Sequence, residues 1–97
     1  MTTKALYAII KNLQTENHFA DTVGYSSKTD EIIIRKSFFY THGGSAESLA
    51  DKINELLIAT SLDGTCKITD KGEVWKDFRG GASVAQQSHW YVKLQAL

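Results

Sequence analysis

The chain has no proline, only one cysteine, and no surplus of either charge, since 11 lysine and arginine residues balance 11 aspartate and glutamate residues. A single cysteine cannot form an internal disulfide. A formal net charge of zero argues against a dedicated nucleic-acid binder that depends on a strong positive field. Because proline is absent, glycine and polar residues must mark the turns.

The sequence also has no charged-then-apolar leader and no long apolar run. We therefore expect no membrane association and, with the lone Cys66, a reducing cytoplasmic location. Hydrophobic residues make up 42% and charged residues 23% of the chain, which are ordinary globular values. At 97 residues the chain predicts one domain that spans 1–97.

Motifs for catalysis and for metal binding are missing as well. His18, His42 and His89 lie far apart in the sequence, and there is no second cysteine for a zinc site. No nucleophile elbow or cysteine-protease signature occurs. We expect a non-enzymatic protein with no catalytic residues, no metal and no cofactor.

Two stretches have helical periodicity. Leu6, Ile9, Ile10 and Leu13 follow a threonine cap and predict a helix over about 3–15. Ser45 can cap a second helix that ends before residue 61. Its apolar stripe consists of Ala46, Leu49, Ala50, Ile53, Leu56 and Leu57.

The remaining apolar segments have the alternation of strands. Residues 19–25 and 31–40 predict one antiparallel hairpin. A second hairpin is predicted around Asp70-Lys71-Gly72, a type I turn followed by a glycine bulge, which would pair Lys67 with Trp75 and Ile68 with Val74. A last strand is expected within 84–94. The order α-β-β-α-β-β-β favours an α+β fold, a two-layer sandwich with an antiparallel sheet and both helices on one face.

Two helices cover only one side of such a sheet. The side chains expected to face them are those of Ile32, Ile34, Phe38, Ile68, Val74, Trp90 and Val92. The opposite, open side would then carry four apolar and aromatic residues, which are Ile33, Phe39, Trp75 and Tyr91. An uncovered patch of this kind often marks an interface. We expect an accessory or interaction protein that forms a homodimer through this face, although isolated exposed aromatic residues can also have no partner.

The same face allows a second hypothesis, the binding of single-stranded nucleic acid. Bases stack on aromatic rings while basic side chains follow the phosphates. The residues that would contact such a ligand are Arg35, Lys67, Arg79, His89 and Lys93.

A third hypothesis is a small-ligand or anion site at His42, Gly43, Gly44 and Ser45, where the chain enters the second helix. The segment lacks the lysine of a P-loop and the spacing of a dinucleotide fingerprint. The sequence therefore favours a plain turn with an N-cap at this position.

Overall fold

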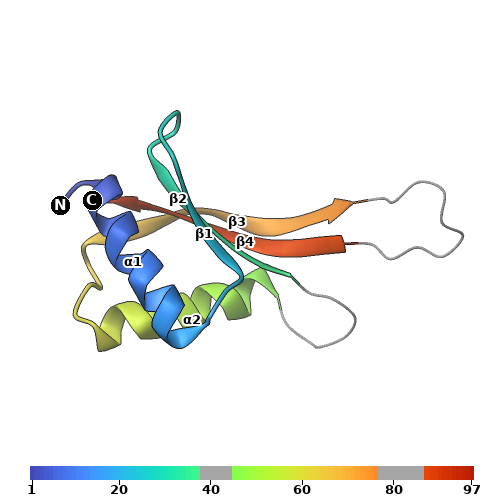
Figure 1. Cartoon of the computed structure of the whole chain (residues 1–97), viewed down its shortest axis with the longest axis horizontal. Helices are drawn as coiled ribbons and strands as arrows, with labels where there is room; N and C mark the ends of the chain where they lie inside the picture. Colours follow the sequence, from blue (N-terminus) through green and yellow to red (C-terminus); the bar gives the residue numbers. More distant parts are fainter. Residues whose placement is uncertain (38–44, 77–86) are drawn as a thin grey trace, which may run out of the picture.

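The computed structural model describes residues 1–37, 45–76 and 87–97, with the backbone alone described at 75, 76, 87 and 88. These residues form two helices, each followed by two strands (Figure 1). In order they are α1 (Thr3–Asn17), β1 (Thr22–Ser26), β2 (Glu31–Ser37), α2 (Ala46–Ala59), β3 (Cys66–Lys76) and β4 (Gln87–Ala96).

The four strands form one antiparallel sheet in the order β1-β2-β4-β3. Both helices lie against the same side of this sheet, so the predicted two-layer α+β architecture is confirmed (Figure 1). The last strand, β4, lies between β2 and β3 and is therefore central although it ends the chain. Thr3 at the start of α1 is buried and its hydroxyl accepts a hydrogen bond from the N–H of Ala96, at 3.1 Å, which ties the two ends of the chain together.

Polar side chains cap the N-termini of both helices, as the sequence predicts. The Thr2 hydroxyl accepts a hydrogen bond from the N–H of Ala5, and α1 ends at His18, whose φ of 51° lies in the left-handed region. At α2, the hydroxyls of Ser45 and Ser48 each accept from the backbone N–H of the other, at 3.1 and 2.9 Å. This reciprocal capping box satisfies two backbone donors that a helix start leaves without partners.

The core fills the space between the helices and the covered side of the sheet. Its most deeply buried side chains come from α1, β2 and β4, and they are Leu6, Ile10, Ile32, Ile34, Val92 and Leu94. Leu49, Ile53 and Leu57 of α2 complete it. Each such side chain stabilises the fold by about 1.5–3 kcal/mol when it leaves water. Among the residues predicted to face the helices, Ile32, Ile34, Trp90 and Val92 are buried, and Ile68 packs against this core.

The predicted hairpin turn at Asp70-Lys71-Gly72 is wrong. These residues lie within β3, a single strand that pairs with β4 along its whole length, so the described residues form six elements where seven were expected. Lys67 pairs with Gln95 and Ile68 with Leu94, not with Trp75 and Val74. The backbone of this segment forms its hydrogen bonds with β4, where a local hairpin would have formed them within the segment. The predicted turn also needs a positive φ at Gly72, but among the described glycines only Gly64 has one.

β3 does contain a bulge, but at Thr69 and not at Gly72, where the sequence predicted one. The register of β3 against β4 shifts between Ile68 and Asp70, which is a bulge at Thr69. One extra residue moves every following side chain to the opposite face. Val74 therefore pairs with His89 on the open side and is 36% exposed, whereas the sequence analysis placed it in the core.

Candidate functional site

The open side of the sheet is built from alternate residues of β2, β3 and β4. Ile33 and Arg35 of β2 pair with Lys93 and Tyr91 of β4, and these pairs share one face because directly opposed residues in antiparallel strands do so. Next to Tyr91 on the other side is Gly72 of β3. Ile33 and Tyr91 are half-buried although no helix covers them.

These side chains surround a shallow hollow of about 270 Å³ on the open face. Its lining is formed by Ile33, Arg35, Val74, His89, Tyr91 and Lys93. Five of these six residues alternate along the two central strands, and Val74 enters because of the bulge in β3. The hollow thus combines two aliphatic side chains with a guanidinium, an amine, a histidine and a phenol.

Tyr91 has the best-defined geometry in the hollow. Its hydroxyl donates a hydrogen bond to the carboxylate of Asp70 at 3.1 Å, and the Lys93 ammonium lies 5.6 Å from the centre of its ring. The hydrogen bond to Asp70, with smaller contributions from desolvation and the Asp70 charge, raises the pKa of the Tyr91 phenol. Tyr91 therefore keeps its proton, and the hydrogen bond to Asp70 orients its ring.

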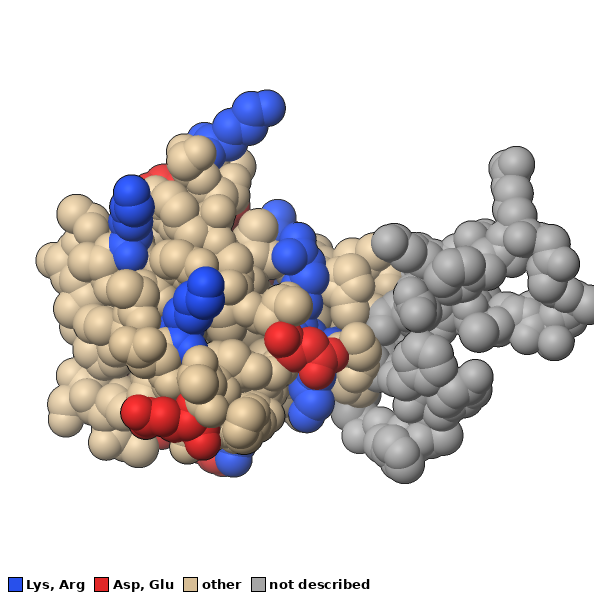
Figure 2. All heavy atoms as spheres, in the orientation of Figure 1, with Lys and Arg blue, Asp and Glu red and all other residues tan. Residues whose placement is uncertain are grey.

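Among the described residues of the open face, three cations face two carboxylates, which are Arg35, Lys67 and Lys93 against Glu31 and Asp70. Within the described part of the chain, Arg35, Lys67 and Lys93 form no ion pair, and the Lys93 ammonium lies over the Tyr91 ring. The carboxylates of Glu31 and Asp70 each accept a hydrogen bond from a hydroxyl, of Thr69 and Tyr91 respectively. Another side of the molecule, drawn in Figure 2, shows acidic and basic side chains interspersed among neutral ones, with no broad field of one sign.

The residues predicted from the sequence are thus partly brought together. Ile33, Tyr91, Arg35, His89 and Lys93 meet in the hollow, and Lys67 lies on the same face. Phe39 and Arg79 lie outside the described residues, as does the side chain of Trp75, whose backbone pairs with Ser88. At the predicted anion site only Ser45 is described, and its side chain caps α2.

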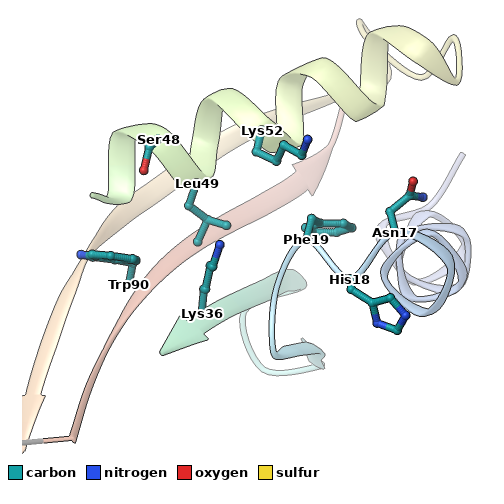
Figure 3. A pocket seen from close by; sticks show the side chains of 8 residues that line it. All are labelled: Asn17, His18, Phe19, Lys36, Ser48, Leu49, Lys52 and Trp90. Atoms are coloured by element: carbon teal, nitrogen blue, oxygen red, sulfur yellow. The ribbon is translucent and has the colours of Figure 1, made fainter. Parts of the chain in front are cut away.

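A second hollow, of about 330 Å³, was not anticipated from the sequence. It lies between the layers, where α1 ends and α2 begins, and Figure 3 shows its side chains. Phe19, Leu49 and Trp90 form its apolar part, and Lys36 and Lys52 contribute amines. Leu49 and Lys52 lie one turn apart on α2, but Phe19, Lys36 and Trp90 come from three other segments, and no spacing in the sequence links those segments to α2. The one available signal is Lys36, which follows Ile32 and Ile34 at an inward-facing position of β2.

Within the described ranges, no group of three or more histidine, cysteine, aspartate or glutamate residues is arranged to hold a metal ion. In the same ranges, neither helix has the length and hydropathy needed to cross a membrane. Comparison of the chain with models of protein families, with curated proteins and with solved structures finds no match.

Proposed function

We propose that the protein is a small, non-enzymatic interaction protein of the cytoplasm, and that a second copy of the chain binds to its open sheet face. The observation that supports this most is the uncovered apolar centre of that face. Ile33 and Tyr91 lie half-buried there beside Val74, which is 36% exposed. The half-buried thiol of Cys66, with no second cysteine in the chain, suits a reducing compartment.

In a homodimer, the apolar centre of one open face would be covered by the apolar centre of the other copy's open face. Two-fold dimers bury the same patch of both copies, and a stable interface removes about 800 Å² from each partner. Tyrosine is among the residues that most often anchor such interfaces. The open face carries both cations, such as Arg35, and carboxylates, such as Glu31, so two copies can also place unlike charges against each other.

Sedimentation equilibrium over a range of protein concentrations tests the proposal. We expect a reversible dimer whose dissociation constant rises about tenfold or more when Val74 is replaced by either Glu or Lys, because either charge would be desolvated at the centre of the interface. The matched controls are Ile58→Glu and Ile58→Lys. Ile58 is an exposed aliphatic residue of α2, 64% accessible, on the helical layer.

Three results would contradict the dimer. The wild-type chain could stay monomeric at the highest concentration, or the Val74 variants could dimerise like the wild type. A dimer that is lost in the Ile58 variants and kept in the Val74 variants would place the interface on the helices. Each variant is first compared with the wild type by thermal unfolding, so that a loss of folding is recognised.

The cation surplus around Tyr91 favours a second candidate function, the binding of single-stranded nucleic acid. Arg35, Lys67 and Lys93 have no carboxylate partner among the described residues, and Tyr91 offers a ring for a base to stack on. If all three cations contact phosphates, the logarithm of the binding constant should fall with the logarithm of salt concentration with a slope of about −2.

The two Val74 variants separate this candidate from the dimer. For a nucleic-acid site, Val74→Lys should strengthen the binding of a fluorescent oligonucleotide and Val74→Glu should weaken it, whereas for the dimer both variants disrupt association. Arg35→Gln should also weaken oligonucleotide binding, and Lys4→Gln, at an exposed position of α1, should not. Binding that does not respond to salt would exclude the nucleic-acid function.

A further inference from the structure

The hollow between the layers has an apolar wall that is already part of the core. Phe19, Leu49 and Trp90 are only 5%, 3% and 8% exposed, yet all three line the same space. They come from the segment after α1, from α2 and from β4. Since buried side chains hold fixed positions, this wall is formed before any ligand arrives. The volume of about 330 Å³ is in the range of small-molecule sites.

Lys36 interrupts the row of apolar side chains on the covered side of β2, next to this hollow. Ile32 and Ile34 precede it on the covered side of β2 and are completely buried, and Lys36 pairs directly with Trp90. Alternation would place a third apolar residue here. Figure 3 instead shows the Lys36 amine directed toward Leu49, with Trp90 and Phe19 on either side. Lys36 makes no ion pair with any described residue.

Lys52 of α2 adds a second amine to the lining. Its nearest carboxylate is that of Glu55, at the long distance of 3.9 Å, and both side chains are mostly exposed, at 56% and 72%. An exposed pair of this kind contributes little and leaves the lysine free to turn toward another anion. No aspartate or glutamate is among the described residues that line the hollow. The site therefore has a positive rim over an apolar wall.

We propose that this hollow binds a small organic carboxylate, with the carboxylate between Lys36 and Lys52 and its alkyl or aromatic body against Phe19, Leu49 and Trp90. A singly charged group fits the lining better than a phosphate. The lining has no arginine to bind a phosphate with two parallel hydrogen bonds, and the Ser48 hydroxyl is already engaged in the capping box of α2.

Octanoate and octan-1-ol form a matched pair of probes, since they share an eight-carbon skeleton and differ in charge. NMR titration of the full chain follows the Leu49 methyl groups and the Trp90 indole N–H. We expect octanoate to shift both signals saturably, with a dissociation constant on the order of 1 mM, as for ligands of about ten heavy atoms. Octan-1-ol should bind about fivefold or more weakly, because it lacks the charge.

Variants of the lysines complete the test. Lys36→Met and Lys52→Met keep most of the side chain and remove the charge, so each should weaken octanoate binding about fivefold and leave octan-1-ol binding within about twofold of the wild type. Lys67→Met is the matched control, a strand lysine on the open face, and should change neither. Measuring two variants keeps the test valid if one of them fails to fold.

Several results would overturn the proposal. Equal affinity for octanoate and octan-1-ol would show that the carboxylate does not contribute to binding. Shifts confined to Tyr91 and Ile33 would place binding on the open face instead. An equal loss of octanoate affinity in Lys67→Met would show only a general effect of protein charge, and the absence of saturation would show that no site exists.

Discussion

The ring of Tyr91 on β4 lies against the backbone of Gly72 on β3. A Cβ atom added at Gly72 would lie 2.9 Å from the Tyr91 hydroxyl oxygen and 3.1 Å from Cζ. Gly72 does not adopt a positive φ, so the advantage of glycine here is the room that it leaves for the end of the Tyr91 side chain. The close approach lets the hydroxyl reach Asp70 on the same strand as Gly72.

Replacing Gly72 by valine should displace the Tyr91 ring and break its hydrogen bond to Asp70. We expect a loss of about 1 kcal/mol in the free energy of unfolding, a moderate value because the end of a side chain can move more easily than backbone. In a Tyr91→Ala background the same substitution should be neutral or stabilising, since valine favours strands. Chemical denaturation of the four proteins measures the coupling, and equal effects in both backgrounds would contradict the contact.

Thr3 links the two ends of the fold through a buried hydroxyl. Thr3→Val keeps the shape of the side chain and leaves the N–H of Ala96 without its acceptor, so we expect a loss of about 1–2 kcal/mol in the free energy of unfolding. The matched control is Thr15→Val at an exposed position of α1, where the hydroxyl donates a hydrogen bond to the carbonyl of Lys11. The control should change stability by less than about 0.5 kcal/mol. A similar loss in both variants would mean that helix propensity, not the buried bond, is being measured.

Alkaline pH should lower the free energy of unfolding through the Tyr91 phenol on the open face. The hydrogen bond to Asp70 raises the pKa of Tyr91, so the folded protein retains the phenol proton more firmly than the unfolded chain does. The resulting stabilisation is complete below the unfolded pKa of about 10 and is lost as the pH rises through the folded pKa. Tyr25 behaves similarly, because its hydroxyl donates to Asp30 at 2.6 Å and its pKa is also raised.

Urea denaturation at a series of pH values checks this expectation. The free energy of unfolding should fall less steeply above pH about 10 in Tyr91→Phe than in the wild type, because the variant has no phenol proton to lose at that position. Phenolate absorbance provides an independent reading of the same titration. Identical pH dependence of the two proteins would show that the Asp70 bond does not form in solution.

Cys66 should react slowly in the folded state. Burial raises the pKa of its thiol, and a hydrogen bond with Thr65 lowers it to a smaller extent, so the net effect is a smaller thiolate fraction near neutral pH. We expect an aromatic disulfide reagent to modify the folded protein several-fold more slowly than the denatured protein. A peptide of residues 62–70 supplies the unburied reference. Equal rates in the peptide and the folded chain would contradict the burial of this thiol.

The sequence alone predicted most of the helical layer. The apolar spacing of Leu6 and Ile10, and the cap at Ser45, depend on interactions within a few residues, which local pattern describes well. Alternation also assigned Ile33, Arg35, Tyr91 and Lys93 to one face of the sheet. The turn predicted at Gly72 failed because a competing long-range partner, β4, pairs with these residues instead.

The two candidate sites were also predicted only in part from the sequence. Alternation within β2 and β4 determined which residues of those two strands share the open face, because successive side chains of a strand point to opposite sides. Only the tertiary structure decided that the bulge at Thr69 moves Val74 onto that face, and that Lys36 meets Phe19 and Leu49 in a hollow between the layers. Both depend on how distant segments pack, and a register shift of one residue or a meeting of separate elements leaves no periodic trace in the sequence.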